Sequence, residues 1–312
     1  MTNTVKAYSA AFAFSLTIGF SFMAIKICLN YASSIDILAH RFFVAGLVAL
    51  GAFLLNKNRP KLKFKELLPV FGLSLFYPLL FFFFQTSSLV YIETVQAGII
   101  QALGPAFVLI LALFILRERI TPLKCLFVLI SVGGVIFIFV MGGAFDASYS
   151  PLGIALIFGA TIAMSCNTVL ARKLTKSYSV FTLATIMSLV GFIVFGIIAL
   201  SINAAQDNLN HFFDPFSQLD YVIAIVFLGV ASSYGSSFLS TYAVSKLQAS
   251  KMSVFTNLST IIALVVGAVF LNEDFFWYHA VGALVVIAGV LGMNLTKDKK
   301  LDTENKAKPV ES

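Results

Sequence analysis

The stretch QAGIIQALGPAFVLILALFILRERITP, residues 96–122, combines the features that decide the fold of this chain. Its apolar run is long enough to cross the ~30 Å hydrocarbon core of a bilayer as a helix. Two glutamines and the pair Gly104-Pro105 interrupt the run, which ends in a charged Arg-Glu-Arg triplet. Because a proline removes a helical hydrogen bond, such a break is tolerated in a membrane where protein or water replaces that bond. The stretch predicts a transmembrane helix interrupted beside a polar site.

The composition of the whole chain also indicates a membrane protein. Of its 312 residues, 59% are hydrophobic and 11% are charged, whereas roughly 25% of the residues of a soluble domain are charged. The alternating dyads of a membrane β-barrel are absent, and the helix is the other structure that satisfies its own backbone in lipid. We therefore predict an all-α membrane protein with ten transmembrane helices. The predicted spans are residues 8–28, 35–55, 67–87, 94–116, 122–141, 151–171, 180–201, 219–240, 249–271 and 276–295.

Basic residues gather on one side of the predicted bundle. With the N-terminus in the cytoplasm, every Lys and Arg except Lys26 and Arg41 falls in a cytoplasmic segment, as the positive-inside rule requires. The outer loops instead hold acids such as Asp146, Asp207 and Asp214. The net charge of +7 is thus a topology signal. We predict a multi-pass protein of the cell membrane, the bacterial inner membrane, with both termini cytoplasmic.

Landmarks in the two halves of the chain recur at one spacing. Glu118 after the fourth span corresponds to Glu273 after the ninth, and Gly134 corresponds to Gly289, each at an offset of 155 residues. Two copies of a five-helix unit are therefore predicted. Because five is odd, the second copy crosses the membrane in the opposite direction, an arrangement that recurs in transporters that work by alternating access. The predicted units are residues 1–145 and 151–296.

The chain resembles the EamA-type members of the drug/metabolite transporter superfamily along nearly its whole length. The resemblance lies in the run from Ile18-Gly19 to Lys26, in Ala39-His40-Arg41-Phe42, in the Leu-x-Glu sequences and following glycines of spans five and ten, and in the inverted repeat. The family often has Trp-Gly in the first motif, and this chain lacks the tryptophan. The resemblance implies export or facilitated passage of amino acids, related metabolites or drugs. It also implies a central cavity between spans one to four and six to nine, with spans five and ten packed peripherally.

Polar side chains form stripes on single faces of the predicted spans. Ser253, Thr256, Asn257 and Thr260 are spaced i, i+3, i+4 and i+7, which places all four on one face of span nine. A buried amide or hydroxyl without a partner costs roughly 1–3 kcal/mol, so this face must meet protein or water. The stripe either lines a cavity or joins helices by hydrogen bonds.

Span eight has a stripe of serines that includes Ser237, and close helix packing is an alternative explanation because Gly229 precedes the stripe. Tyr234 beside it offers a hydroxyl and a flat apolar ring, a combination suited to an amphipathic organic substrate. In span three we select Tyr77, which precedes Pro78, and also Gln85.

In span four, Gln101 is the predicted substrate contact near the bilayer midplane, and Gly104-Pro105 is the predicted hinge. A kink that merely fits the fold is the alternative. Span six adds Ser165 and Asn167. The predicted substrate-binding residues are Tyr77, Gln85, Gln101, Ser165, Asn167, Tyr234, Ser237, Thr256 and Asn257.

Two basic residues lie inside predicted spans, where a central charge costs about 2.5–3.5 kcal/mol on insertion scales. Lys26 and Arg41 both fall in the outer third. Each either extends its charge to the outer interface, pairs with Glu93 to gate the cavity, or meets a substrate carboxylate. His40 is a candidate for a protonation step, which leaves proton coupling open. No acid lies in the middle of a span, which argues against a cationic-drug antiporter driven by carboxylate protonation.

Other classes of protein fit less well. His40, His211 and His279 lack metal-binding spacing and no nucleophile-base pair is evident, so we predict no enzyme, catalytic residue, metal or cofactor. A sensor acting through residues 297–312 is a rival, but that tail is poor in apolar residues and predicted to be disordered in the cytoplasm. We predict no nucleic-acid partner, and a monomer and a homodimer are both open. The predicted function is transport, with export favoured, of a small metabolite such as an amino acid by alternating access; a drug-like or other organic solute is the alternative.

Overall fold

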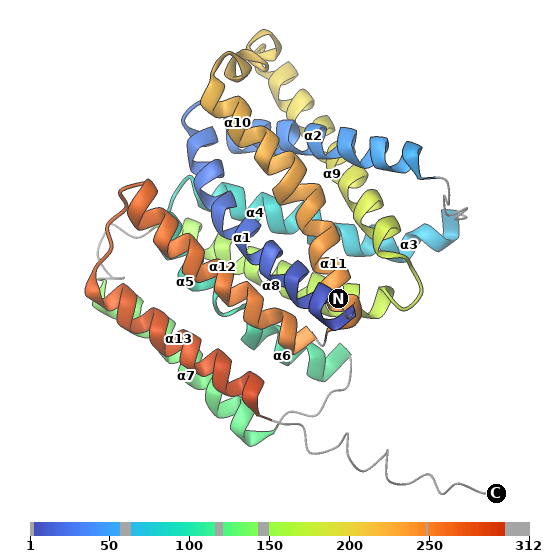
Figure 1. The fold of residues 1–312 in the computed structure, drawn as a ribbon. Helices are drawn as coiled ribbons and strands as arrows, with labels where there is room; N and C mark the ends of the chain where they lie inside the picture. Colours follow the sequence, from blue (N-terminus) through green and yellow to red (C-terminus); the bar gives the residue numbers. More distant parts are fainter. Residues whose placement is uncertain (1–2, 57–63, 116–120, 143–149, 248, 297–312) are drawn as a thin grey trace, which may run out of the picture.

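The structure, a computed structural model, describes residues 3–56, 64–115, 121–142, 150–247 and 249–296, and every regular element in these ranges is a helix. Figure 1 shows their arrangement. The first half contains α1 (Asn3–Leu29), α2 (Ser34–Leu55), α3 (Phe64–Ser74), η1 (Leu75–Leu80), α4 (Phe81–Ser88), α5 (Thr94–Gln101), α6 (Gly104–Ile115) and α7 (Pro122–Met141). The second contains α8 (Pro151–Leu174), α9 (Val180–Ala205), η2 (Leu209–His211), η3 (Asp214–Ser217), α10 (Leu219–Phe227), η4 (Leu228–Gly235), α11 (Ser236–Lys246), α12 (Ala249–Phe270) and α13 (Trp277–Leu295).

Within the described ranges, seven apolar helical stretches are long enough to cross a membrane, and each coincides with a predicted span. They are Thr4–Leu29, Ser34–Leu55, Leu67–Ser88, Thr94–Ile115, Pro151–Leu174, Val180–Ala205 and Leu219–Lys246. Three shorter apolar helices, Pro122–Ile138, Leu258–Phe270 and Trp277–Gly289, lie in the three remaining predicted spans. The prediction of an all-helical fold is therefore confirmed for the described residues.

Hydroxyl side chains fix where several helices begin. Ser33, Thr121, Ser150 and Ser179 occupy the N-cap positions of α2, α7, α8 and α9, and each accepts a hydrogen bond from a backbone N–H of the first turn. Proline follows directly in α7 and α8, where its missing N–H costs nothing. These local signals explain why the predicted and observed starts agree.

Three of the long apolar stretches are interrupted. Tyr77, which precedes Pro78 in η1, has φ −144° and ψ 115°, the extended conformation that a following proline favours. In the second half, the π-helical segment η4 separates α10 from α11. The third interruption lies between Gln101 and Gly104, where α5 ends and α6 begins, at the predicted Gly104-Pro105 break.

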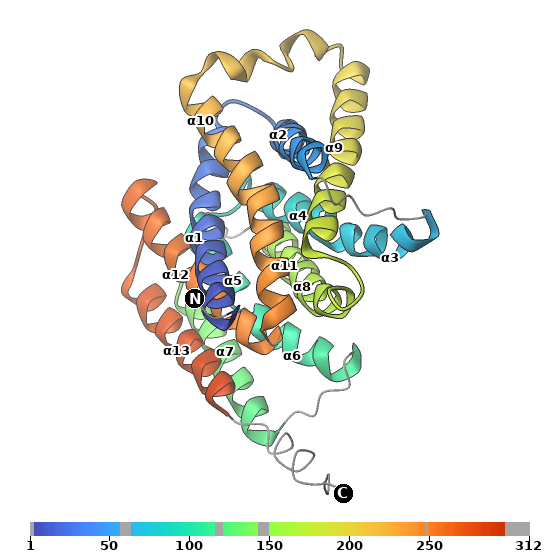
Figure 2. The same ribbon diagram turned by 45° about the vertical axis from the view of Figure 1, so that its right-hand side comes forward.

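The bundle places helices from the two halves side by side. Figures 1 and 2 show α1 beside α12, α10 and α11, and α2 beside α9. The pair α7 and α13 lies at the edge of the molecule in both views. Residues 116–120 and 297–312, which include Glu118 and the predicted tail, lie outside the described part of the chain.

Glycines bring α7 and α13 into close contact. A Cβ on Gly134 would lie 2.9 Å from the Gly282 carbonyl oxygen, and one on Gly289 would lie 2.7 Å from the Phe127 carbonyl oxygen. Ser131 Oγ donates a 3.2 Å hydrogen bond to the Val286 carbonyl. Because the partner numbers on α13 fall as those on α7 rise, the two helices run antiparallel.

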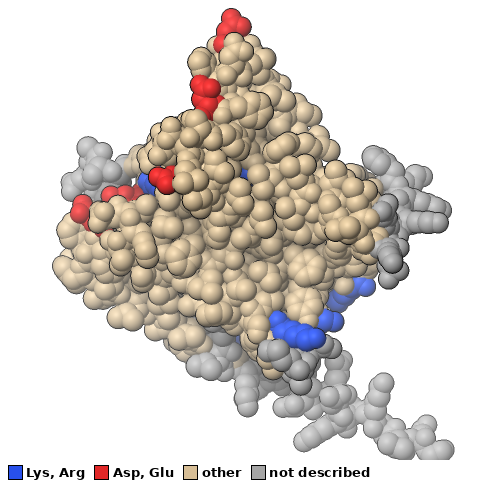
Figure 3. All heavy atoms as spheres, turned by 45° about the horizontal axis from the view of Figure 1, so that its top comes forward, with Lys and Arg blue, Asp and Glu red and all other residues tan. Residues whose placement is uncertain are grey.

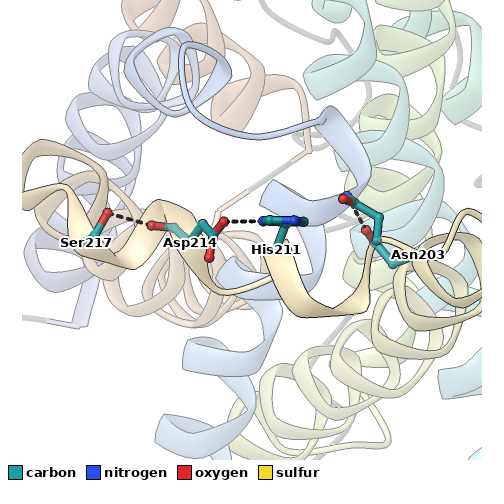
Figure 4. A network of polar contacts seen from close by, with 5 residues as sticks. Asn203, His211, Asp214 and Ser217 are labelled. Atoms are coloured by element: carbon teal, nitrogen blue, oxygen red, sulfur yellow. Dashed lines mark hydrogen bonds and ion pairs between the residues drawn. The ribbon is translucent and has the colours of Figure 1, made fainter.

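The connection between α9 and α10 forms a cap at one end of the bundle (Figure 1), and Figure 4 shows its polar contacts from close by. His211 Nδ1 lies 2.6 Å from Asp214 Oδ2, and Ser217 Oγ donates to the Asp214 carbonyl at 2.7 Å. Asn203 Nδ2 donates to Asp36 Oδ1 at 2.7 Å, which ties the end of α9 to the start of α2. Figure 3 shows acidic side chains at the top and left of the molecule and the larger basic patch at the opposite end.

Candidate functional site

Arg41 lies at the contact between α2 and η4 and is completely buried. Its Nε donates to Ser233 Oγ at 3.0 Å, and its Nη2 donates to Ser232 Oγ at 3.1 Å. The guanidinium carbon lies 4.1 Å from the centre of the Phe82 ring, within the range of a cation–π interaction. Among the described residues, Nη1 has no hydrogen-bond partner and no carboxylate lies within ion-pair distance of this side chain.

Tyr77 reaches the same region from η1. It is fully buried, its ring centre lies 4.9 Å from that of Phe82, and its hydroxyl is 2.7 Å from Ser236 Oγ at the start of α11. Ser236 in turn donates to the Ser232 carbonyl at 2.5 Å. The helix interruptions η1 and η4 therefore meet around one charged side chain. We call the six residues Arg41, Tyr77, Phe82, Ser232, Ser233 and Ser236 the arginine cluster.

Gln85 lies one turn after Phe82 on α4, on the helix face that contributes to the arginine cluster. It is completely buried, and neither its Nε2 nor its Oε1 has a hydrogen-bond partner among the described residues. Leaving such groups unpaired costs about 1–3 kcal/mol, which makes Gln85 a candidate for contact with a solute.

A second polar site lies at the break between α5 and α6. Ser165 Oγ on α8 donates to the carbonyl oxygens of Gly104, at 3.2 Å, and of Thr161, at 2.7 Å. A cavity of about 10 Å³ opens here, which is room for about one water molecule. Gln101 Nε2 is buried beside it without a described partner. The cavity is lined by Gln101, Gly104, Val108, Thr161, Met164, Ser165, Thr168 and Thr256.

The predicted substrate-binding residues thus fall into two groups rather than one. Gln101, Ser165 and Thr256 share the cavity at the α5–α6 break. Tyr77 belongs to the arginine cluster, and Gln85 lies one turn along α4 from its member Phe82.

Of the other predicted substrate-binding residues, Ser237 lies at the arginine cluster, within hydrogen-bonding reach of Tyr77, and the remaining three lie elsewhere. Ser237 is buried next to Ser236. Asn167 is buried with Oδ1 unpaired among the described residues, and it does not line the 10 Å³ cavity. Tyr234 is half-buried in η4 and packs against the apolar core. The side chain of Asn257, on α12, lies outside the described part of the structure.

The end of the bundle that is predicted to face outward holds the predicted gate residues Lys26 and Glu93. Lys26 Nζ donates to the Ile92 carbonyl at 2.9 Å, and Glu93 forms no described ion pair with it. Partial burial raises the pKa of Glu93, and the nearby charges of Glu273 and Asp274 raise it further, whereas Lys26 acts in the opposite direction. Arg41, the third predicted gate residue, points to the serines of η4 instead.

Glu273 caps α5 from a distant part of the chain. Its two carboxylate oxygens accept 2.9 Å hydrogen bonds from the backbone N–H groups of Thr94 and Val95. A carboxylate there satisfies free amides and interacts favourably with the positive end of the helix dipole.

Arg172 repeats the arrangement of Lys26 in the second half. Its Nη1 donates to the carbonyl oxygens of Val244, at 3.2 Å, and of Leu247. Lys26 and Arg172 both lie in the last turn of the first helix of their half. Ile92 and Leu247 each lie two positions before the helix that follows. The two basic residues therefore make corresponding bonds in the two halves.

His40 is enclosed by aromatic rings. Its Nδ1 is 2.6 Å from the Tyr221 hydroxyl, and its ring centre lies 4.4 Å from that of Phe212 and 4.8 Å from that of Phe216. Only 2% of its surface is exposed. The side chain predicted as a candidate for protonation therefore packs beneath the α9–α10 cap.

Sequence reasoning missed Ser232 and the Arg172 bonds. Ser232 is not among the four serines of the span-eight stripe, but it lies one turn before Ser236, in the π-helical segment η4, and faces Arg41. Arg172 was counted only as a cytoplasmic charge. Its position before the Ser179 cap, which matches that of Lys26 before the Ser33 cap, is the signal that could have identified it.

Comparison with known proteins identifies the class of this chain. The EamA-like transporter family matches it twice, over residues 5–140 and 151–295. The chain therefore belongs to the EamA-like transporter family, and the apolar helices together with this membership define a multi-pass membrane transporter.

Similar proteins are known from bacteria and archaea. The uncharacterized transporter YcxC of Bacillus subtilis (strain 168) is 42% identical, with 94% of each chain covered. An uncharacterized transporter of Archaeoglobus fulgidus is 30% identical over 87% of this chain and 92% of its own. A crystal structure with 14% sequence identity matches the fold with a TM-score of 0.66, covering 94% of this chain and 99% of the other.

Proposed function

We propose that this transporter moves a small metabolite, such as an amino acid, across the cell membrane by alternating access, and that it works as an exporter. The observation that carries the proposal is the set of buried polar side chains gathered at three helix interruptions. Interrupted helices near the middle of the membrane supply free backbone and polar groups to the substrate sites of many transporters. An interior that only joined helices would pair these groups with one another.

Two oppositely oriented halves of five spans each fit the arrangement of the helices. The 155-residue offset that relates Glu118 to Glu273 also relates the first residue of α7, Pro122, to the first residue of α13, Trp277. These two helices run antiparallel, as two copies related by a two-fold axis in the membrane plane would. Such halves can exchange conformations and open a shared site to either side.

The proposed substrate site spans the two polar groups. Gln101, Ser165 and Thr256 already surround a common cavity, but its ≈ 10 Å³ volume is far below the ~300 Å³ of a typical small-molecule site. Binding therefore requires the helix halves to separate. The break at Gly104-Pro105, where α5 and α6 are already distinct helices, is the proposed hinge.

The proposed gates lie at the two ends of the bundle. On the outer side, Lys26 holds the segment before α5, with Glu93 and Glu273 beside it. On the inner side, Arg172 holds the segment before α12 in the corresponding way. Opening either end of the cavity requires release of one of these bonds, so one gate can open while the other stays closed.

Transport by purified protein in liposomes tests this proposal. Counterflow of a panel of radiolabelled L-amino acids and other small metabolites is compared with protein-free liposomes. For a transported solute, Gln101→Ala and Thr256→Ala are each expected to lower kcat/KM about tenfold, because loss of one hydrogen bond worth about 1.4 kcal/mol changes affinity by that factor.

Ser201→Ala is the matched control, because Ser201 is an exposed hydroxyl on α9 far along the chain from either polar group. It is expected to transport at the wild-type rate. If the panel shows no protein-dependent flux, the proposed solute class is wrong. If flux occurs and Gln101→Ala, Thr256→Ala and Asn257→Ala all retain it, the proposed site is wrong.

A further inference from the structure

We propose that Arg41 binds the carboxylate of the transported solute, so that the transporter selects small organic acids and zwitterions over their neutral or cationic relatives. This inference rests on the proposed function, because it names the chemical group that the interior site recognises. None of the other residues of the arginine cluster is negatively charged. A bound carboxylate would therefore supply the charge that balances Arg41.

The first step is the uncompensated charge. A guanidinium group removed from water loses several kcal/mol of solvation, and proteins usually recover this by pairing it with a carboxylate. Arg41 is completely buried, and its described polar contacts are the neutral hydroxyls of Ser232 and Ser233 and the Phe82 ring. An ionisable residue kept inside a membrane span points to a functional site, and a solute pathway is one of the sites that such residues mark.

The second step is the set of free donors. A guanidinium group has five N–H donors in a planar fork. Nε and Nη2 of Arg41 are engaged by the two serines, whereas Nη1 has no described partner. This free end offers two N–H groups and one positive charge, which suits a singly charged carboxylate better than a doubly charged phosphate.

The third step is the polar groups around Arg41. Gln85 carries an unpaired amide donor and an unpaired acceptor on the α4 face that contributes Phe82. Tyr77 adds a hydroxyl 2.7 Å from Ser236 Oγ. The oxygens of Gln85 and Tyr77 can accept hydrogen bonds from an ammonium group, so an amino acid could place both of its charged groups here.

The position of Arg41 gives a solute a way to reach it. Its two serine partners lie in η4, Tyr77 lies in η1, and both segments interrupt their helices. Movement at these interruptions would open the arginine cluster without unwinding a regular helix. A bound carboxylate would then supply the charge that is missing in the closed arrangement.

Ligand-induced stabilisation in detergent tests the proposal without requiring transport. The melting temperature of the purified protein is measured at constant ionic strength against a panel of L-amino acids, their carboxamides, their N-acetyl derivatives and inorganic phosphate. We expect amino acids and N-acetyl amino acids, which keep the carboxylate, to stabilise the wild type, and the carboxamides and phosphate to be at least tenfold weaker.

Arg41→Gln is expected to weaken the carboxylate-bearing probes at least tenfold and to leave the melting temperature without ligand unchanged or higher, because it removes an uncompensated buried charge. Arg41→Lys keeps the charge but loses the planar fork, and an intermediate affinity is expected. Lys173→Gln is the control, because it also removes one positive charge but at an exposed position near the end of α8. This variant should bind the probes as the wild type does.

Three results would overturn the proposal. The first is that no carboxylate stabilises the wild type, and the second is that wild type and Arg41→Gln bind N-acetyl amino acids equally well. The third is that Arg41→Gln weakens the binding of all probes equally and also melts at a lower temperature, which would show that Arg41 has only a structural role. If Arg41→Gln does not fold, unchanged carboxylate affinity in Arg41→Lys overturns it. Flux that Arg41→Gln leaves unaltered contradicts this inference while the proposed function stands. If carboxylates bind but no flux occurs, the proposed function is contradicted and the carboxylate site at Arg41 stands.

Discussion

At the scale of single residues, the interior is defined by polar atoms that the described structure leaves unpaired. Arg41 Nη1, both amide atoms of Gln85, Gln101 Nε2 and Asn167 Oδ1 are all buried in this way. These unpaired atoms are the observation on which the proposed substrate site rests. Polar residues that do form bonds, such as Glu273, have a structural role that can be tested separately.

Glu273→Ala is expected to destabilise the protein by about 1–2 kcal/mol, because it removes the acceptor of two backbone N–H groups at the start of α5. The free energy of unfolding in detergent micelles is the measurement. Asp274→Asn is the matched control, since Asp274 is exposed, and a change within about 0.5 kcal/mol is expected there. Equal losses in both variants would show that the cap contributes no stability.

At the scale of elements, helices meet in two ways, through closely packed glycines and through buried polar side chains. The helices α7 and α13 approach closely through glycines, with a single side-chain bond from Ser131 across the contact. Helices α2, α4 and α11 instead meet through the arginine cluster, together with the π-helical segments η1 and η4. We infer that the first contact is a fixed edge and the second is the part that moves.

Gly134→Ala tests this fixed edge. Its new methyl group would lie 2.9 Å from the Gly282 carbonyl oxygen, so α7 and α13 must move apart, at an expected cost of about 1–3 kcal/mol. Gly133→Ala is the control on the neighbouring residue, because nothing lies within 4 Å of the added Cβ. There the gain in helix propensity, up to about 1 kcal/mol, should leave the melting temperature unchanged or raised. A melting temperature that falls equally in both variants would contradict the close contact.

At the scale of the whole molecule, the proposed transport cycle assigns this structure to a state closed at both ends. Lys26 bonds to the Ile92 carbonyl at the end predicted to face outward, and Arg172 bonds to Val244 and Leu247 at the end predicted to face inward. The cavity beside Gln101 has room for about one water molecule. In the proposed cycle, release of one end at a time exposes the cavity to one side of the membrane. The two basic residues should therefore have opposite effects.

This opposition is testable with Gln101→Cys as a reporter, in a background where Cys28, Cys125 and Cys166 are replaced by alanine. Lys26→Gln is expected to speed labelling by a membrane-impermeant maleimide several-fold from the outside, and Arg172→Gln from the inside, because each removes one carbonyl contact. Right-side-out and inside-out vesicles separate the two sides. Lys173→Gln should change neither rate. Faster labelling from the same side in both variants would contradict the pairing of gates.

Much of the fold could be predicted from the sequence, because the forces that place helices in this chain are local. Runs of apolar residues fixed where the spans lie, caps such as Ser33 and Ser179 fixed where helices begin, and Gly104-Pro105 fixed the break between α5 and α6. The candidate site was predicted less completely. Three of the predicted substrate-binding residues, Gln101, Ser165 and Thr256, line one cavity. Tyr234, which was also predicted, packs against the apolar core instead.

By itself, the amino-acid sequence determined that this chain is a helical membrane protein of the EamA type, with residues such as Arg41 and Gln85 too polar for lipid. The tertiary structure decided which of these residues meet. Arg41 bonds to Ser233 across 192 positions of sequence, and Glu273 bonds to Thr94 across 179. A stripe on one helix shows only that a polar face needs a partner. Which partner it finds depends on how helices far apart in the chain pack, and on the shift of register that a π-helical segment introduces.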